Sequence, residues 1–495
     1  MLYYCTQRTP THHPSYLIIF SKNLENQQKK NIKLPKSEKM EGEAKTSIPA
    51  HVLIFPFPLQ GHINPMLQFS KRLAFKGLKV TLVTTQSLSK LLPPQSESSL
   101  IQIRSINDGL NDREKVDHVA YLELFQRVVP ISLANLLKEY KVTSHPVKFI
   151  VYDSVITWVL ELARTVGIDG APFFTQTAAV HAIHYHVYEG ALKFPFKSSL
   201  ISMPSIPLLR VNEMPSLIVN PGIYPSLNDL SINQSLNFHK ATLLFFNTFD
   251  KLESQVLDWM RSQWPIKTIG PAIPSMYLDK RLEDDNEYGL SFFKPETDAC
   301  LQWLDARETS SVVYIAMGSL ASLGAEEMEE IAKGVINTEK HFLWVVRASE
   351  EDKLPPNFKE EISGKALVVN WCPQLAVLAH RAIGCFVTHC GWNSTLEAIS
   401  IGVPLVAMPQ WVDQPTNAKY INDVWRNGVR LKVDEKGIVT RDELKACILE
   451  VMEGERASEI RSNVAKWKKL AQEAMDEGGS SDRNIEEFAA KLKNI

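Results

Sequence analysis

The sequence lacks the features that mark membrane-spanning, secreted and nucleic-acid-binding proteins. Its apolar runs fall well short of the roughly 18 residues that a transmembrane helix requires. A formal charge of −2 provides no basic excess for nucleic acid. The six cysteines among 495 residues include no Cys-x-x-Cys pair, which is typical of reduced thiols rather than of a disulfide framework. We therefore expect a cytoplasmic protein that binds neither membranes nor nucleic acid.

The first 49 residues also lack the pattern of a folded domain or of a targeting signal. They are polar and rich in lysine, without the long apolar core of a signal peptide or the Arg/Ser richness of a transit peptide. We interpret residues 1–49 as a disordered N-terminal extension. Because Met40 begins the segment MEGEAKTSIPAHVLIF, we hypothesise that residues 1–39 are dispensable for activity.

From residue 51 the sequence alternates short apolar runs with amphipathic segments. Runs such as HVLIFPF (51–57) and VKFIVYD (147–153) are typical of strands buried on both faces of a parallel sheet. The alternation pauses in an acidic, aperiodic stretch and then resumes with SVVYIAMG (311–318). This pattern indicates an α/β protein with two facing doubly wound, Rossmann-like domains. The expected parts are a domain over 50–271, a linker over 272–298, a domain over 299–479 and a C-terminal helix over 480–495.

A nicotinamide-dependent dehydrogenase would also have doubly wound sheets, but its fingerprint is missing. No G-x-G-x-x-G motif follows the apolar run 51–57. The run 79–85 ends in Thr84, Thr85 and Gln86, without the acidic residue that binds the ribose of NAD. We therefore disfavour a dehydrogenase.

The segment from Trp371 to Gln414 collects the groups that a nucleotide-sugar requires. Trp371 offers a flat ring on which a base can stack, and Gln374 can hydrogen-bond a base or a ribose. At Gly391 the strand CFVTHC turns into a helix whose first N–H groups suit an anion. We expect phosphate contacts from three polar residues at this turn, His389, Asn393 and Ser394.

Several of these residues also have a purely structural explanation. Ser394 and Glu397 form an S-x-x-E capping box, which would account for both without a ligand. His389 lies in an apolar strand and would, taken alone, be a satisfied core histidine. Asp413 followed by Pro415 is a good helix start without any function.

A histidine and an aspartate end two strands of the first domain. His62 follows the run 51–57 within PFPLQGHINP, and Asp153 ends the run 147–153. Carboxyl ends of parallel strands share one sheet edge, so the two side chains can meet. A carboxylate that orients an imidazole and stabilises its cation is what a general base needs.

The segment 371–414 resembles the signature box of the plant family 1 UDP-glycosyltransferases, a family with the GT-B fold. The resemblance implies inverting transfer of glucose from UDP-glucose to a small plant metabolite, by direct displacement at the anomeric carbon. It matches His62 and Asp153 to the catalytic dyad, places the acceptor in the domain over 50–271, and returns the helix over 480–495 to that domain. Its donor-binding residues correspond to Ser319, Trp371, Gln374, His389, Trp392, Asn393, Ser394, Glu397, Asp413 and Gln414.

Within the family, the texture of the chain is similar to the branch that glucosylates small carboxylic acids such as salicylate and indole-acetate. The expected product is therefore a glucose ester, or a glucoside of a phenol or alcohol. No acidic metal-binding pair is evident near the phosphate site, so we expect no metal and no further cofactor, and we expect a monomer. The alternatives are a UDP-sugar epimerase or hydrolase on the same fold, or a non-catalytic UDP-sugar-binding protein.

Overall fold

The computed structural model describes residues 49–494, except for 90–100, 111–117, 290–292 and 363. The extension expected over 1–49 therefore lies, apart from its last residue, outside the described part of the chain. The chain divides into two compact units. Of the described residues, the C-terminal unit contains Arg210–Ser216 and those between Phe293 and Leu470, and the N-terminal unit contains those from 49 to Leu209, those between Leu217 and 289, and those from Ala471 onward.

The N-terminal unit is built on a seven-stranded sheet in which all neighbouring strands are parallel. Its strand order is β3-β2-β1-β4-β5-β8-β9. The bounds are β1 (His51–Phe55), β2 (Lys79–Thr85), β3 (Ile101–Ile106), β4 (Val147–Asp153), β5 (Asp169–Phe174), β8 (Leu244–Phe246) and β9 (Ile266–Thr268). A separate hairpin pairs β6 (Leu200–Met203) with β7 (Ile206–Arg210).

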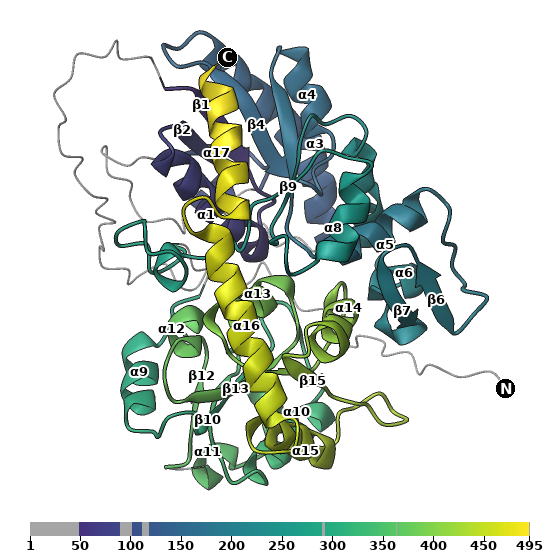
Figure 1. The fold of residues 1–495 in the computed structure, drawn as a ribbon, viewed down its shortest axis with the longest axis vertical. Helices are drawn as coiled ribbons and strands as arrows, with labels where there is room; N and C mark the ends of the chain where they lie inside the picture. Colours follow the sequence, from purple (N-terminus) through teal and green to yellow (C-terminus); the bar gives the residue numbers. More distant parts are fainter. Residues whose placement is uncertain (1–48, 90–100, 111–117, 290–292, 363, 495) are drawn as a thin grey trace. The chain divides into compact units, whose positions relative to one another are not determined.

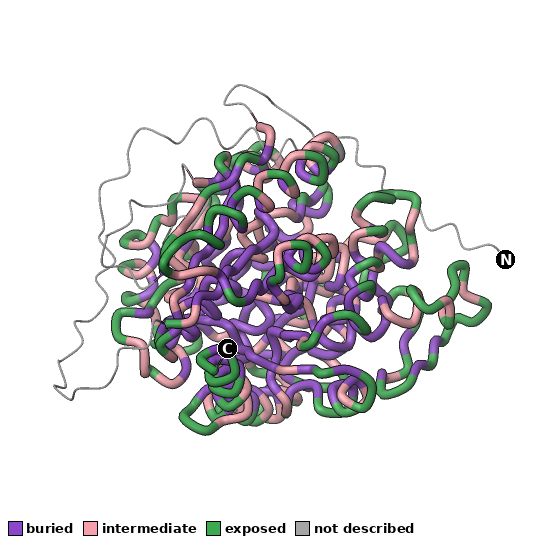
Figure 2. Tube along the Cα trace, turned by 90° about the horizontal axis from the view of Figure 1, so that it is seen from above, coloured by how far each residue is buried: buried purple, intermediate pink, exposed green. Residues whose placement is uncertain are grey.

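The helices that precede residue 290 are α1 (Gln60–Phe75), α2 (Gln86–Ser89), α3 (His118–Lys141), α4 (Val159–Thr165), α5 (Ala178–Tyr188), α6 (Ser216–Val219), α7 (Pro225–Asn233) and α8 (Ser254–Arg261). Helices of the N-terminal unit, among them α1, α3 and α4, lie against this sheet, whereas α6 lies beside the β6–β7 hairpin (Figure 1). The central strands are largely apolar, as expected of strands buried on both faces, and β1 is fully buried. Figure 2 shows the buried chain in the interior and the exposed residues on outer helices and loops.

The C-terminal unit repeats this plan with six parallel strands in the order β12-β11-β10-β13-β14-β15. The strands are β10 (Val312–Ala316), β11 (His341–Val345), β12 (Ala366–Val369), β13 (Ile383–Thr388), β14 (Leu405–Ala407) and β15 (Gly428–Arg430). The helices are α9 (Thr297–Asp305), α10 (Ala325–Ile336), α11 (Phe358–Glu361), α12 (Gln374–Leu378), α13 (Trp392–Ile401), α14 (Gln414–Lys419), α15 (Arg441–Met452) and α16 (Ala457–Met475).

The last helix, α17 (Ser480–Lys493), packs into the core of the N-terminal unit. The ring centroid of Phe488 lies 4.9 Å from that of Phe245 on β8. The stretch before residue 290 packs in the same unit, since Arg72 on α1 pairs with Asp279 at 2.5 Å and Arg281 pairs with Asp482 at 2.8 Å. The stretch predicted as a linker is therefore ordered against α1 and α17 over much of its length.

Both main sheets confirm the predicted doubly wound α/β architecture. In each, the strand order reverses between two neighbouring strands, β1 and β4 in one sheet and β10 and β13 in the other. Ligands of such sheets bind outside the carboxyl ends of strands at this switch point. In the part of the chain that the structure describes, no helix is both long enough and apolar enough to cross a bilayer.

Candidate active site

His62 and Asp153 meet at the switch point of the N-terminal sheet. Asp153 ends β4, and His62 lies in the first turn of α1, directly after β1. Because β1 and β4 pair in parallel, their carboxyl ends deliver the two side chains to one edge. The Nδ1 atom of His62 lies 2.7 Å from Oδ2 of Asp153, whose side chain is fully buried, whereas that of His62 is 23% exposed. The structure thus brings the predicted pair together.

The surroundings of Asp153 fix the direction of this hydrogen bond. Its Oδ1 accepts from the backbone N–H of Val155 at 3.2 Å, and Oδ2 accepts from that of Phe57 at 3.4 Å. Since an ionised carboxylate only accepts hydrogen bonds, Nδ1 of His62 must carry the proton that it donates. Nε2 of the ring is then left as the basic nitrogen, which is the tautomer that a general base requires.

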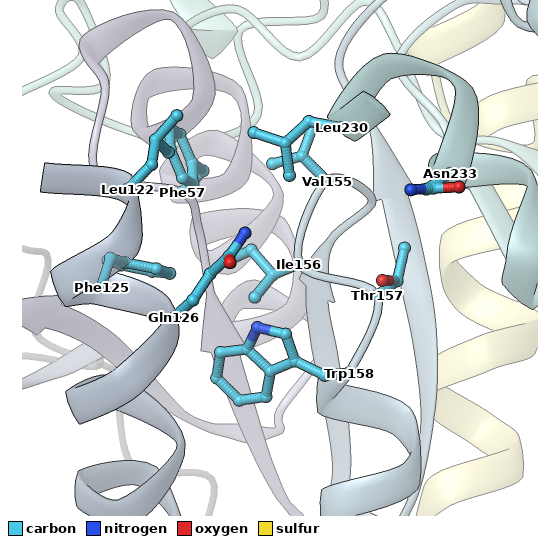
Figure 3. Close-up of a pocket in the computed structure, with 10 residues that line it drawn as sticks. All are labelled: Phe57, Leu122, Phe125, Gln126, Val155, Ile156, Thr157, Trp158, Leu230 and Asn233. Carbon is cyan, nitrogen blue, oxygen red and sulfur yellow. The ribbon is translucent and has the colours of Figure 1, made fainter. Parts of the chain in front are cut away.

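A small cavity of about 110 Å³ adjoins the pair (Figure 3). Two of its lining residues, Phe57 and Val155, are those whose N–H groups bind Asp153. The ring of Phe57 also lies edge-on to that of His62, with ring centroids 5.6 Å apart. Most of the wall is apolar or aromatic, and none of the described lining residues carries a formal charge. The lining consists of Phe57, Leu122, Phe125, Gln126, Val155, Ile156, Thr157, Trp158, Leu230 and Asn233.

In the C-terminal unit, His389 follows β13 and occupies space that two glycines leave open. A Cβ atom on Gly391 would lie 2.5 Å from Nε2 of His389, and one on Gly318 would lie 2.6 Å from the same atom. Cys390, between the histidine and Gly391, has a φ of +65°, so the turn into α13 is tight. The two glycines therefore permit the imidazole to sit at the switch point of this sheet, between the loop after β10 and the start of α13.

The charge state of His389 follows from its environment. Burial lowers the pKa of His389 to about 4, against the opposing effect of the Ala316 carbonyl, and the positive charge of Arg347 acts in the same direction as burial. The ring is therefore neutral at pH 7. It can act on a diphosphate as a hydrogen-bond donor but not as a cation.

Arg347 is a buried cation that the sequence analysis missed. Its guanidinium donates to the backbone carbonyls of Ser319 and Ala321, in the loop after β10. It also lies 3.7 Å from the carboxylate of Glu350. Arg347 thus holds the loop that carries Ser319 and places positive charge near His389. The sequence around Arg347 does not indicate this role, because the loop that carries Ser319 lies far from Arg347 in the chain.

The candidate base-binding residues lie where β12 leads into α12. Trp371 is partly exposed, and the ring of Phe293 packs against it with centroids 4.4 Å apart and planes inclined by 31°. The amide of Gln374 belongs to an internal network, since its Oε1 accepts from Tyr314 at 3.0 Å. Its Nε2 donates to Ser394 at 2.8 Å and to Glu397 at 2.7 Å.

The Gln374 network replaces the capping box that the sequence suggested. Helix α13 begins at Trp392 with Gly391 as its N-cap, and no side chain caps it. Ser394 is therefore the third helical residue rather than the N-cap, so the capping-box interpretation is wrong. Since the hydroxyl of Ser394 accepts from Gln374, its own proton is directed elsewhere, which suits a phosphate oxygen. Glu397 is nearly buried beside it.

The sugar-binding candidates Asp413 and Gln414 are held by their own loop. The Oε1 atom of Gln414 accepts from the backbone N–H groups of Gln410 at 2.8 Å and Trp411 at 3.0 Å, which orients its amide. Asn417, which the sequence analysis missed, donates from Nδ2 to Asp413 at 2.8 Å and to the carbonyl of Cys390 at 2.9 Å. This buried amide joins the predicted sugar-binding pair to the predicted phosphate-binding turn.

Two further predicted residues lie at the start of α13. Asn393 is half-buried in its first turn. Trp392 is only 3% exposed, and its ring packs beside that of Trp425 with centroids 5.9 Å apart. The indole of Trp392 therefore belongs to the core, and its place beside the sugar stays a prediction. Among the residues that the structure describes, no group of three or more His, Cys, Asp or Glu side chains is arranged to hold a metal ion.

Comparisons with known proteins show which family this chain resembles. The family model for UDP-glucoronosyl and UDP-glucosyl transferase matches residues 237–471. Mogroside I-E synthase from Siraitia grosvenorii is 53% identical over 446 residues, covering 90% of this chain and 98% of that protein. UDP-glycosyltransferase 74E2 from Arabidopsis thaliana is 47% identical over 448 residues, covering 89% and 98%. The structure of Os79 from O. sativa in complex with UDP matches with a TM-score of 0.83 and 39% identity, covering 89% of this chain and 100% of that one.

Likeness of this extent, in sequence and in fold, shows both the GT-B architecture and the enzyme class. The chain therefore belongs to the plant family 1 UDP-glycosyltransferases.

Proposed function

We propose that the protein transfers glucose from UDP-glucose, with inversion, to an oxygen of a small and largely apolar plant metabolite. The observation that carries this proposal is the 2.7 Å hydrogen bond between His62 and the fully buried Asp153, next to an uncharged cavity. The cavity would receive the acceptor beside the general base.

The reaction is a single displacement. As the acceptor oxygen bonds to the anomeric carbon, its proton passes to Nε2 of His62, and the bond from that carbon to the UDP oxygen breaks. Asp153 stabilises the imidazolium as it forms. Because one displacement occurs at the anomeric carbon, its configuration inverts.

The leaving diphosphate is stabilised by neutral donors and by a helix start. The first turn of α13 presents backbone N–H groups with Asn393 and Ser394, and His389 lies beside it as a neutral donor. A helix N-terminus contributes at most about 2 kcal/mol to an anion. Hydrogen bonds to a charged group contribute roughly 1.5–3 kcal/mol each. The side chains therefore account for most of the binding, with the helix dipole as support.

The family resemblance assigns the hexose to glucose, through Gln414, and the loop after β14 supplies groups that suit a hexose. The Gln414 amide is fixed through its oxygen, so its NH₂ group is the part that suits a sugar hydroxyl. The Asp413 carboxylate, held by Asn417, supplies an acceptor. An acidic residue followed by an oriented amide matches vicinal hydroxyls, which either donate or accept.

The cavity favours a hydroxyl acceptor over a carboxylic acid. An apolar cavity near this size accepts a single ring-sized apolar group, as an engineered cavity of about 150 Å³ accepts benzene. None of its described lining residues is a cation, and an unpaired carboxylate there would be poorly solvated. The names of the relatives point the same way, since one makes mogroside I-E and Os79 has been solved with a trichothecene. We rank a glucoside of a phenol or alcohol first and a glucose ester second.

The test uses purified full-length protein, UDP-glucose and matched acceptor pairs, each pair being a phenol and a carboxylic acid on the same ring system. Products that gain one hexose in mass are treated with alkali, which cleaves esters and spares glucosides. The anomeric proton coupling then reports the configuration. We expect β-glucosides of the phenols, and turnover that persists in EDTA because the reaction needs no metal. Release of free glucose or formation of UDP-galactose without acceptor glucosylation would instead show a hydrolase or an epimerase.

A further inference from the structure

A short segment between β7 and α6 packs against the sugar-binding loop. Residues Arg210–Ser216 cluster with the C-terminal unit, although the chain on either side of them clusters with the N-terminal one. Their partners are the loop before α14 and α14 itself. None of the mechanism proposed above uses this segment.

Two hydrogen bonds join Ser216 to Val412. The backbone N–H of Ser216 donates to the carbonyl of Val412 at 2.8 Å, and the Ser216 hydroxyl accepts from the N–H of Val412 at 2.7 Å. Val412 has a φ of +57°, the left-handed region, which a β-branched residue rarely adopts. Such a conformation persists only where neighbouring structure enforces it. Ser216 binds both the backbone N–H and the carbonyl of Val412, on either side of its Cα atom, and so supplies that enforcement.

Glu213 holds the segment in place. It is 7% exposed, and its Oε2 accepts from the backbone N–H of Arg210 at 2.7 Å. Its Oε1 accepts from Lys419 of α14 at 3.3 Å, and its backbone carbonyl accepts from the Thr416 hydroxyl at 2.8 Å. The guanidinium of Arg430 donates to the carbonyl of Asn212 at 3.0 Å. The segment is therefore fastened to α14, and Ser216 cannot move away from Val412 without breaking these contacts.

Val412 directly precedes Asp413 and Gln414. We propose that Ser216 is a positioning residue: by holding Val412 in the left-handed conformation it aims Asp413 and Gln414 at the hexose of the donor. This inference rests on the proposed function, since it assigns those two residues to the sugar. Ser216 and Glu213 bind the loop before α14 and α14 itself, so Ser216 should govern recognition of the hexose and not of UDP.

The test compares Ser216→Ala, which loses the hydroxyl, with Ser216→Thr, which keeps it. Michaelis constants for UDP-glucose, the rate ratio of UDP-glucose to UDP-galactose, and calorimetric affinity for UDP are measured for each. For Ser216→Ala we expect a rise of roughly three- to tenfold in the KM for UDP-glucose, about the contribution of one hydrogen bond, and a reduced glucose preference. UDP affinity should be unchanged, and Ser216→Thr should restore the wild-type values.

The Ser216→Ala substitution in a Val412→Asn protein tests whether Ser216 acts by holding the backbone conformation of residue 412. Asn adopts the left-handed region several-fold more readily than Val, so the loss caused by Ser216→Ala should shrink in a Val412→Asn protein. Equal losses in both backgrounds would overturn the proposal. So would wild-type donor kinetics in Ser216→Ala, or a parallel loss of UDP affinity. A wild-type protein that binds UDP yet transfers no glucose would refute the proposed function instead, so the two failures are distinguishable.

Discussion

The hydrogen bond between Asp153 and His62 leads to a sharp prediction for Asp153→Asn. Both carboxylate oxygens of Asp153 accept from a backbone N–H, but the bond from Val155 to Oδ1 is shorter, at 3.2 Å against 3.4 Å from Phe57 to Oδ2, so we expect the oxygen of the new amide on the Oδ1 side. The NH₂ group then faces Nδ1 of His62, where Oδ2 was. An NH₂ group donates, so Nδ1 must become the acceptor and the ring proton must move to Nε2. The substitution therefore removes the basic nitrogen as well as the negative charge.

The size of the effect follows from Coulomb's law. Charge centres about 4 Å apart interact by about 4 kcal/mol at an effective dielectric constant of 20. Every 1.36 kcal/mol of transition-state stabilisation is tenfold in rate, so losing the carboxylate costs about a thousandfold. This lies inside the range of roughly 10²–10⁴ for general base catalysis. We expect kcat for a phenol or alcohol acceptor to fall by about that factor.

The assay is steady-state glucosylation of a neutral hydroxyl acceptor at saturating UDP-glucose, with product followed by mass. Thr175→Val is the matched control, because the Thr175 hydroxyl also lies near Nδ1 of His62, at 3.3 Å, but carries no charge. Its kcat should change by less than about tenfold, the contribution of one neutral hydrogen bond. Calorimetric UDP affinity should be intact in both variants. An Asp153→Asn enzyme within threefold of wild type would refute the general-base role of the pair.

Three further outcomes are expected. His62→Ala should reduce glucosylation of phenols far more than ester formation, because a carboxylic acid is already ionised at pH 7 and a phenol, with a pKa near 10, is not; equal losses on both acceptor classes would argue against proton abstraction. Gly391→Ala should weaken UDP binding more than tenfold in calorimetry, since its Cβ would lie 2.5 Å from Nε2 of His389 and displace the ring. Gly324→Ala, whose Cβ meets nothing within 4 Å, is the control and should bind UDP as wild type does. Burial lowers the pKa of both His51 and His389 to about 4. Below pH 6.5 the unfolded chain therefore gains protons that the folded one does not, and the free energy of unfolding should fall toward pH 4 by up to about 1.4 kcal/mol per pH unit for each histidine. Urea midpoints against pH would show this, with a shallower slope in His51→Gln.

The sheets and both switch-point sites could be predicted from the sequence because their signals are local. Strands buried on both faces are continuous apolar runs, and polar residues that directly follow them must lie at the carboxyl edge. His62, Asp153 and His389 were found in this way. Short strands such as β9 and β15, with three residues each, leave too little pattern to recognise.

What the sequence could not show depends on contacts between distant segments. The bonds from Arg347 to the carbonyls of Ser319 and Ala321 join the segments that follow two different strands, β11 and β10. Those from Ser216 to Val412 join residues nearly two hundred positions apart. The capping box failed for a different reason. The S-x-x-E pattern is a local preference, but α13 already begins at Trp392, so Ser394 joins the network of Gln374 instead.

The two histidines at the switch points show how one residue type is given opposite tasks. His62 is partly exposed and bonded to a carboxylate, so its protonated form is stabilised when it accepts a proton. His389 is half-buried and has the cation Arg347 nearby, and desolvation keeps its pKa at about 4, so it stays neutral well below pH 7. A protonated His389 would bind diphosphate more tightly in the ground state and in the product alike, which would slow release of UDP. A neutral donor avoids this. Replacing His389 with a neutral amide donor (His389→Gln) should therefore preserve more activity than replacing it with a cation (His389→Lys). The His389→Lys enzyme should also release UDP more slowly than the wild type.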